Sequence, residues 1–282
     1  MPRVLIAGCG YVGQATADLF RGRGWEVEGW TASAESAAQL SDKPYPIIAV
    51  DVSHRDQVNA HPENFDAVIH CASTRGGDVD LYRRVYLEGA RNLLDRFVGS
   101  TILFTSSTSV YGQKNGEWVT EESETAPARD TGQILLEAER IILGSGGIVT
   151  RLAGIYGPGR SALLQKFLKG HAAVDPQDDR YVNQVHRDDI AAALLHLLDR
   201  QTRAPEIYNV VDNEPILQSE CYRWLSEKLN RPLPPPARST PVPKRGASNK
   251  RVSNAKLRGI GWVPRYPSFA EGMEKSILPS RA

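Results

Sequence analysis

The sequence predicts an α/β fold in which a doubly wound parallel sheet is followed by a smaller C-terminal α/β lobe. Short apolar runs alternate with helical patterns through the first half of the chain, and a glycine-rich turn follows the first run. With 41% apolar residues, a chain of 282 residues can bury a large core. In this βαβ order the strands run parallel, and a ligand binds outside their carboxyl ends. Strands are expected at residues 3–7, 26–30, 47–50, 67–71, 101–106 and 147–152, and helices at 12–21, 34–40, 81–97 and 131–143.

The last third of the chain has a different pattern. Residues 154–159 are a turn-rich break, and residues 232–250 are rich in proline and basic side chains. This pattern is typical of a lobe made of short elements. Helices are expected at 187–200 and 218–230, with short elements at 253–259 and 267–278.

Charge and cysteine content exclude several classes of protein. Lys and Arg number 34 and Asp and Glu 33, and the resulting net charge of +1 argues against a general binder of nucleic acids or membrane surfaces. Cys9, Cys71 and Cys221 are widely spaced and odd in number, which indicates a reducing compartment, with neither a disulfide framework nor a metal site. No leader-like segment precedes the first strand, and no apolar run approaches 18 residues. We expect a cytoplasmic protein.

The first chemical motif is Gly8-x-Gly10-x-x-Gly13, which follows an expected strand and opens an expected helix. Gly8 would allow a tight turn, Gly10 would let the backbone approach a pyrophosphate, and Gly13 would let helix and strand pack closely. The N–H groups of Tyr11 and Val12 would then face the phosphates at the helix N-terminus. Glycines with a purely structural role are the alternative. The motif in this context favours a Rossmann-type dinucleotide site.

The end of the second strand indicates which dinucleotide is bound. Eighteen residues after Gly13, where an NAD-binding protein presents an acid to the ribose 2′-hydroxyl, the chain has Thr31, followed by Ser33. Without a carboxylate to repel a 2′-phosphate, NADP is favoured over NAD. An arginine for that phosphate would have to come from a neighbouring loop, as Arg55 or Arg75.

Two further tracts carry a resemblance to a known family. Residues 104–112 read Phe-Thr-Ser-Ser-Thr-Ser-Val-Tyr-Gly, and residues 131–139 read Thr-Gly-Gln-Ile-Leu-Leu-Glu-Ala-Glu. They resemble the serine strand and the Tyr-x-x-x-Lys helix of the extended short-chain dehydrogenases/reductases, the NAD-dependent epimerase/dehydratase family, and within it the atypical YeeZ-like branch. The resemblance implies that Ser107 orients the substrate. It places Thr131 at the family's tyrosine and Leu135 at its lysine.

The loss of that pair bears directly on catalysis. A phenol with an unperturbed pKa of about 10 can transfer a proton near neutral pH when an ammonium group lies beside it. Thr131 has no comparable route to an anion, and Leu135 removes the cation. Tyr111, four residues after Ser107, is the best substitute acid, although packing under the lobe explains it equally well.

The resemblance also implies further ligand contacts. Asp51 and Val52 match the segment beside the adenine ring, with a helix N-cap as the alternative role for Asp51. In the tract 70–73, Ala72 and Ser73 would lie against the cofactor, whereas packing is favoured for the preceding histidine and cysteine.

On the lobe side, the resemblance implies that Arg160 and Asn183 contact substrate. Nucleotide-sugar epimerases usually have an arginine and an aspartate where Val182 and Asn183 stand, so the substitution argues against a nucleotide-sugar substrate. The implied organisation is an NAD(P)-binding domain at 1–155, to which 184–212 return, and a mainly substrate-binding lobe at 156–282.

Two functions from different classes remain open. One is an NADP-dependent oxidoreductase or epimerase acting on a small polar substrate without Tyr-x-x-x-Lys. The other is a non-catalytic redox sensor or scaffold that binds the dinucleotide without turnover. Ser107 and the lobe elements favour the enzyme, and the missing pair favours the sensor. Either would act as a monomer or homodimer with a small-molecule ligand.

Overall fold

The computed structural model describes residues 1–62, 64–74, 76–175, 179–200, 204–236 and 248–281. Its centre is a seven-stranded sheet in which every neighbouring pair is parallel. The order β3-β2-β1-β4-β5-β7-β11 reverses direction between β1 and β4, which confirms the predicted doubly wound sheet. The strands are β1 (Arg3–Ala7), β2 (Glu26–Thr31), β3 (Ile47–Ala49), β4 (Ala67–His70), β5 (Thr101–Ser107), β7 (Ile148–Leu152) and β11 (Ile207–Val210).

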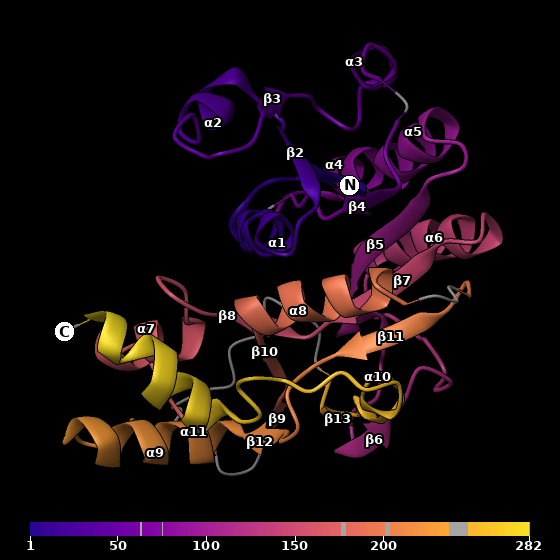
Figure 1. Ribbon diagram of the computed structural model, residues 1–282. Coiled ribbons are helices and arrows are strands. Elements are labelled where there is room, and N and C mark those ends of the chain that lie inside the picture. The colour runs from indigo at the N-terminus through magenta and orange to yellow at the C-terminus, as the bar shows by residue number, and fades with distance from the viewer. Residues whose placement is uncertain (63, 75, 176–178, 201–203, 237–247, 282) are drawn as a thin grey trace.

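Helices cover both faces of this sheet (Figure 1). Helix α1 (Tyr11–Gly22) packs against α8 (Arg187–Leu198), and α5 (Gly89–Arg96) packs against α6 (Asp130–Gly144). Because chain order runs in opposite directions on the two sides of β1, right-handed crossovers place these helix pairs on opposite faces. Two short helices, α2 (Ala34–Ala38) and α3 (Arg55–Asn59), flank β3.

The helix expected at 81–97 differs in detail from the prediction. It begins as α4 (Val79–Tyr82), widens into the π-helical segment η1 (Arg83–Glu88) and continues as α5. A π-helical segment inside a longer helix is rare and often marks a functional site. Hydrophobic periodicity gave no sign of it, because so few residues are involved.

The remaining described elements lie outside the central sheet and include three two-stranded sheets. These are β8 (Gly154–Tyr156) with β10 (Gln184–His186), β9 (Tyr181–Val182) with β12 (Ile216–Leu217), and β6 (Glu117–Val119) with β13 (Lys250–Val252). Much of the loop expected at 232–250 lies outside the described residues. The helical elements are η2 (Thr108–Val110), α7 (Ala162–Leu168), α9 (Gln218–Leu229), α10 (Ala255–Gly259), α11 (Phe269–Gly272), η3 (Met273–Ile277) and η4 (Pro279–Arg281).

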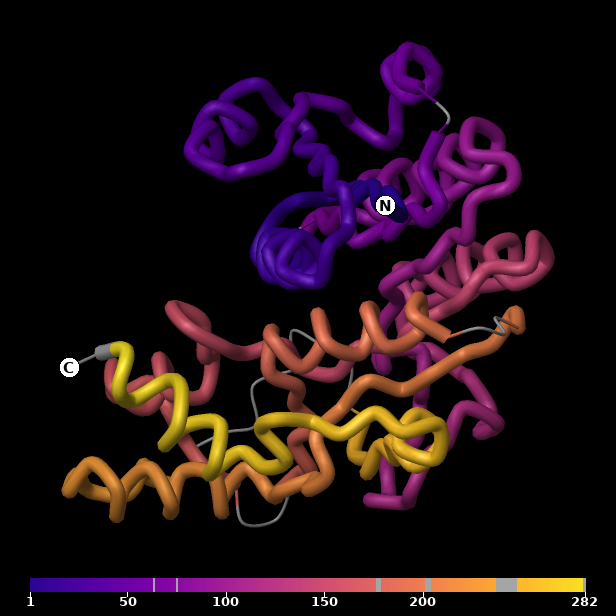
Figure 2. Tube along the Cα trace, in the orientation of Figure 1, coloured from indigo at the N-terminus to yellow at the C-terminus, as the bar shows by residue number. Residues whose placement is uncertain are grey.

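The buried apolar residues fall into two clusters. The larger one fills both faces of the sheet and includes Trp30, Phe104 and, from the C-terminal third, Trp262. The smaller one joins α7, α9 and the C-terminal helices, with Tyr222 and Met273 among its members. In Figure 2 the C-terminal segment lies along α9, which it contacts. Among the described residues, no helix is long and apolar enough to cross a bilayer.

Candidate dinucleotide site and its surroundings

The glycine turn lies between the end of β1 and the start of α1. Gly8 has φ +112°, and a Cβ atom there would lie 2.2 Å from the backbone nitrogen of Ala72. A Cβ atom on Gly13 would lie 2.3 Å from the carbonyl oxygen of Gly8, so both glycines are required by close packing. A Cβ atom on Gly10 would meet nothing within 4 Å. Gly10 therefore borders open space at the N-terminus of α1.

The start of α1 suits an anionic ligand. No side chain caps this helix, and its first turn contains no acidic residue. The backbone N–H groups of Tyr11, Val12 and Gly13 belong to that turn, where the helix dipole favours negative charge. The open side of Gly10 gives a phosphate room to approach these groups.

At the end of β2, the hydroxyl groups of Thr31 and Ser33 have local partners. Thr31 donates to the carbonyl oxygen of Ser33 at 3.2 Å, and Ser33 accepts from the N–H of Ser36 at 3.2 Å, which caps α2. The structure therefore places both residues at the carboxyl edge without a carboxylate between them. Arg55 is ion-paired with Asp95 at 3.1 Å on the surface, so a 2′-phosphate would compete with that carboxylate for it, and its contact with the phosphate stays a prediction. Arg75 lies outside the described residues.

Asp51 forms a turn with Ser53 and does not cap α3. Its carboxylate accepts from the N–H of Ser53 at 2.9 Å and from the hydroxyl at 2.8 Å, whereas His54 is the N-cap residue of α3. The alternative role of Asp51 as a helix cap is therefore wrong. Val52 is buried, with 4% of its surface exposed, and its carbonyl oxygen accepts from Asn92 at 2.9 Å. Contact of Asp51 and Val52 with adenine stays a prediction.

The end of β4 packs against the glycine turn. His70 is fully buried, and its Nε2–H donates to the carbonyl oxygen of Val85 at 3.2 Å. Its pKa is lowered to about 4 because burial disfavours the imidazolium. The Cys71 thiol donates to the carbonyl oxygen of Gly8 at 3.2 Å. Packing accounts for both side chains, whereas Ser73 is exposed just beyond them.

Ser107 ends β5 at the same edge of the sheet. Its side chain is partly exposed, and its oxygen accepts from the N–H of Ser109 at 3.1 Å, which caps η2. This contact uses a lone pair and leaves the hydroxyl proton available for a ligand. Thr131 and Leu135 both lie on α6, but Leu135 is only 4% exposed and belongs to the larger core. The place on α6 where the resemblance implies a lysine is therefore occupied by a buried apolar side chain and carries no cation.

The structure argues against Tyr111 as the substitute acid. Tyr111 is 1% exposed, its hydroxyl donates to Asn209 at 2.9 Å, and the same oxygen accepts from Arg151 at 2.9 Å. Burial raises the pKa of its phenol, with the Arg151 charge opposing that shift. The side chain turns into the core after η2, so its hydroxyl has no access to a ligand beside Ser107.

Asn183 is also engaged within the protein. Its amide nitrogen donates to the carbonyl oxygen of Lys250 at 2.8 Å, and its amide oxygen accepts from the N–H of Val252 at 2.7 Å. Both functional groups of the amide hold β13 in place. The expected substrate contact of Asn183 is therefore not supported by the geometry.

The glycine turn and the lobe meet at Tyr11. The Tyr11 hydroxyl donates to the carbonyl oxygen of Pro158 at 3.0 Å. The guanidinium carbons of Arg160 and Arg187 lie 5.2 Å and 5.0 Å from the centre of the Tyr11 ring. Each arrangement is a cation–π contact. Arg160 thus belongs to a group of positive charges beside the start of α1, and its contact with substrate stays a prediction.

Lys250 has a role that was not predicted from the sequence. This lysine is 5% exposed, and its ammonium donates to the carbonyl oxygen of Tyr111 at 2.9 Å and to the hydroxyl of Ser248 at 3.1 Å. Burial lowers its pKa to about 8, because neither of these partners carries a charge to offset desolvation. A lysine therefore does approach the turn after Ser107, but from β13 and not from α6. No signal in the sequence indicated this role, because Lys250 stands at the end of the proline-rich, basic segment 232–250.

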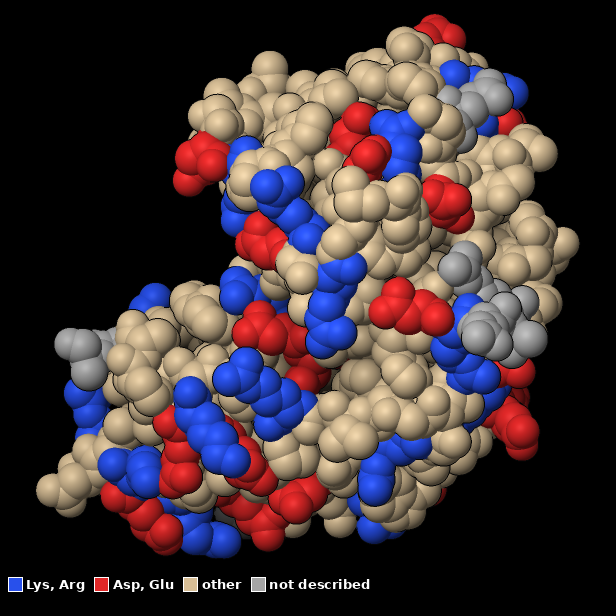
Figure 3. Space-filling view, in the orientation of Figure 1, with Lys and Arg blue, Asp and Glu red and all other residues tan. Residues whose placement is uncertain are grey.

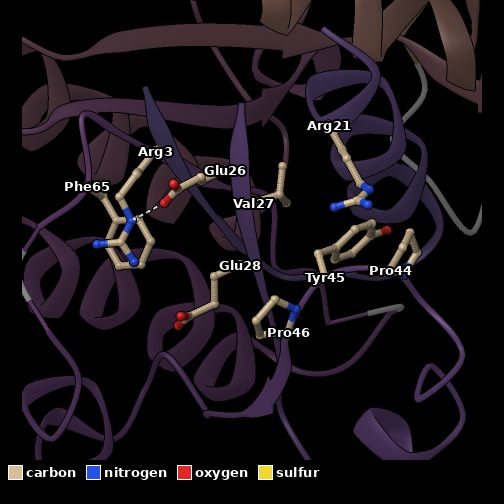
Figure 4. A pocket seen from close by; sticks show the side chains of 9 residues that line it. All are labelled: Arg3, Arg21, Glu26, Val27, Glu28, Pro44, Tyr45, Pro46 and Phe65. Carbon is tan, nitrogen blue, oxygen red and sulfur yellow. Dashed lines mark ion pairs between the residues drawn. The ribbon is translucent and has the colours of Figure 1, made fainter. Parts of the chain in front are cut away.

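One surface pocket lies away from this edge. It has a volume of about 270 Å³ and is lined from the amino ends of β1 and β2, with Arg3 ion-paired to Glu26 at 3.2 Å (Figure 4). Ligands of doubly wound sheets bind at the opposite, carboxyl ends. The space-filling view is hollowed between the part carrying α1 and α2 and the part carrying α7, and Lys and Arg side chains flank this hollow (Figure 3). Among the described residues, no group of three or more His, Cys, Asp or Glu side chains is placed to hold a metal ion.

The fold and the glycine turn define a Rossmann-type protein, and comparison identifies its family. Residues 4–210 match the model of the NAD dependent epimerase/dehydratase family, and the chain belongs to that family. It is 32% identical to Protein YeeZ of Escherichia coli K12 over 221 residues, which cover 74% of this chain and 77% of YeeZ.

Solved structures agree with this assignment. A structure from Methylobacillus flagellatus, described as a putative NAD-dependent epimerase/dehydratase, is 29% identical with a TM-score of 0.80, covering 100% of this chain and 99% of the other. The UDP-glucose 4-epimerase of Thermus thermophilus, in complex with NAD, is 22% identical with a TM-score of 0.81 and the same coverage. The second likeness concerns the fold alone.

Proposed function

We propose that this protein binds NADP(H) across the carboxyl ends of β1, β2 and β4 and acts as an oxidoreductase or epimerase on a small polar substrate. The observation that carries the proposal is the uncapped start of α1 beside Gly10, where a Cβ atom would meet nothing within 4 Å. That arrangement offers backbone N–H groups and space to a pyrophosphate. Membership of the family supports a nicotinamide dinucleotide as the ligand.

The preference for NADP over NAD rests on the end of β2. Thr31 and Ser33 present no carboxylate there, so a 2′-phosphate meets no like charge. Ser33 caps α2 with its oxygen, which keeps its hydroxyl group at this edge. The arginines around Tyr11 add positive charge nearer the diphosphate.

Ser107 is the residue that would hold the substrate. A bound nicotinamide supplies a carbon that can give or accept hydride. Ser107 can donate its hydroxyl proton to a substrate oxygen, since the N–H of Ser109 occupies only a lone pair. Leu135 is buried in the core on α6 and supplies no charge there.

The second candidate is a sensor or scaffold that binds the dinucleotide without turning it over. The observation in its favour is the burial of Leu135 at 4% exposure, which leaves α6 without the amine that would make a nearby phenol a proton donor. Under this proposal, binding of the dinucleotide would be transmitted to the lobe through the hydrogen bond from Tyr11 to Pro158.

Thermal-shift titration tests the cofactor. A ligand that binds only the native state raises its apparent stability by mass action, about 2.7 kcal/mol at a concentration 100-fold above Kd. We expect a larger rise with NADP(H) than with NAD(H). No rise with any dinucleotide would overturn both candidates. Binding without oxidation of NADPH by small aldehydes and ketones, without reduction of NADP⁺ by small hydroxy acids, and without epimerisation of those hydroxy acids would favour the sensor.

A further inference from the structure

A second tyrosine lies at the carboxyl edge of the sheet, on the π-helical segment η1. The Tyr86 hydroxyl is 3.5 Å from the hydroxyl oxygen of Ser73, and its ring lies 6.3 Å from that of Phe104 on β5. Its side chain is partly buried between β4, β5 and the helix that packs on α6. Unlike Tyr111, it therefore directs its hydroxyl group toward the end of a strand and not into the core.

Strand register relates the loop that carries Ser73 to the strand that ends at Ser107. His70 of β4 pairs with Phe104 of β5 in the parallel sheet. Ser107 ends β5, whereas Ser73 lies in the loop three residues beyond the end of β4. The Tyr86 phenol on η1, which reaches Ser73, thus lies beyond the end of β4, the strand next to β5.

One polar group near this phenol lacks a hydrogen-bond partner among the described residues. The hydroxyl oxygen of Thr74 is buried without a hydrogen-bond partner among the described residues. A buried hydroxyl without a partner is costly unless a ligand or water satisfies it. Ser73, Thr74 and Tyr86 therefore form a small hydroxyl cluster, in which the Thr74 hydroxyl can take a further hydrogen bond.

The direction in which a dinucleotide crosses the sheet indicates which end of it lies beside this hydroxyl cluster. With the adenosine at the end of β2 and the diphosphate at the start of α1, the nicotinamide lies over the other half of the sheet, beyond β4. We propose that Tyr86 donates a hydrogen bond at the nicotinamide end of the site, so that the phenol comes from η1 and not from α6. This inference rests on the proposed function, because it requires the dinucleotide to bind.

The protonation state of the phenol agrees with a donor. Burial raises the pKa of Tyr86, and the Ser73 and Thr74 groups oppose that shift less strongly. The phenol therefore stays protonated at neutral pH. A tyrosine without an ammonium beside it suits hydrogen bonding and polarisation better than rapid proton release.

Fluorine NMR of the full-length protein tests the placement. Tyr86→3-fluorotyrosine is nearly isosteric, and Tyr82→3-fluorotyrosine is the matched control, since the two rings lie 4.9 Å apart on one helix. The phenol is titrated in the presence of NADP⁺, NADPH or 2′-phospho-ADP-ribose, which lacks nicotinamide, with the NAD series run alongside. Because oxidised nicotinamide is a cation, we expect it to lower the apparent pKa at position 86 by about one unit relative to NADPH, a tenfold change in proton affinity.

The outcomes separate this inference from the proposed function. A resonance at position 86 that responds to the oxidised nicotinamide, with a smaller response at position 82, supports the placement. Equal titration midpoints with NADP⁺, NADPH and phospho-ADP-ribose, while all three bind, would overturn the role of Tyr86 and leave the dinucleotide site standing. Failure of every dinucleotide and of the phospho-ADP-ribose to bind would overturn both.

Discussion

The carboxylate of Glu139 on α6 lies 2.6 Å from a terminal guanidinium nitrogen of Arg151 on β7, and neither side chain is more than 4% exposed. Glu139 also accepts from Ser106 at 2.5 Å, and Arg151 donates to Tyr111. Each charge is thus buried with a partner and further hydrogen bonds, which is the condition under which a buried ion pair is tolerated. The pair fixes the position of α6 against β7, and the bond from Ser106 fixes it against β5, the strand that carries Ser107.

Glu139→Gln should therefore destabilise the protein strongly. The change leaves the guanidinium of Arg151 buried without a counter-charge, which typically costs about 3–5 kcal/mol. Glu137→Gln is the matched control, because Glu137 is 39% exposed on the same helix and pairs with Arg83 at 3.4 Å; we expect a loss of about 1 kcal/mol or less. Urea unfolding measures both, and equal losses would show that burial of the pair does not matter.

Much of the sheet could be predicted from the sequence. Strands β1, β4 and β7 are short apolar runs because both faces of a parallel sheet are buried, and turn residues mark their ends. The glycine turn was equally predictable, because close packing at Gly8 and Gly13 admits no side chain. At these glycines the requirement for a residue without a side chain arises within one short motif, so the sequence of that motif is enough to predict it.

The roles of several site residues could not be predicted in this way. Tyr111 follows Ser107 closely in sequence, but its hydroxyl contacts Asn209, 98 positions away. Asn183 likewise bonds to a strand 67 to 69 residues further along the chain. Such contacts depend on how the lobe folds back, and hydrophobic periodicity carries no information on that.

Lys250→Met should change the dependence of stability on pH. The folded-state pKa of about 8 lies below the ordinary value of 10.5, so between these pH values the unfolded chain binds more protons and raising the pH stabilises the wild type. Removal of the amine abolishes this gain. We expect the stability of the variant relative to wild type to fall by roughly 3 kcal/mol as pH rises from about 8 to about 10.5.

Urea unfolding at several pH values from neutral upward measures this difference. Lys256→Met is the matched control, since Lys256 is 39% exposed and pairs with Glu206 at 3.4 Å. The control should give a difference that is nearly independent of pH. If the difference in unfolding free energy between Lys250→Met and wild type does not change with pH, a negative charge must stabilise the Lys250 ammonium in the folded wild-type protein.

Gly10→Ala should weaken dinucleotide binding while leaving the stability of the fold nearly unchanged. A Cβ atom at this position meets no protein atom within 4 Å, so we expect unfolding free energy to change by less than about 1 kcal/mol. The same methyl group would occupy the space through which a pyrophosphate reaches α1, and dinucleotide affinity should fall at least about tenfold. Calorimetric titration measures the affinity.

The helical Gly144→Ala is the control for this experiment. Its Cβ atom also meets nothing within 4 Å, but Gly144 ends α6 far along the chain from the turn. Replacement of a helical glycine by alanine should stabilise slightly, by about 0.5–1 kcal/mol, and leave binding unchanged. Normal dinucleotide affinity in Gly10→Ala would place the pyrophosphate elsewhere.

Ser33→Asp should reverse the preference for NADP. Aspartate caps helices as well as serine does, so α2 stays intact while a carboxylate appears at the end of β2. The new charge repels a 2′-phosphate and can accept from a 2′-hydroxyl, so NADP affinity should fall roughly tenfold while NAD affinity holds or rises. Ser41→Asp, just beyond α2, controls for added charge alone and should leave the ratio unchanged. If Ser33→Asp weakens both dinucleotides equally, the ribose does not lie at Ser33, and the argument for NADP from this strand end fails.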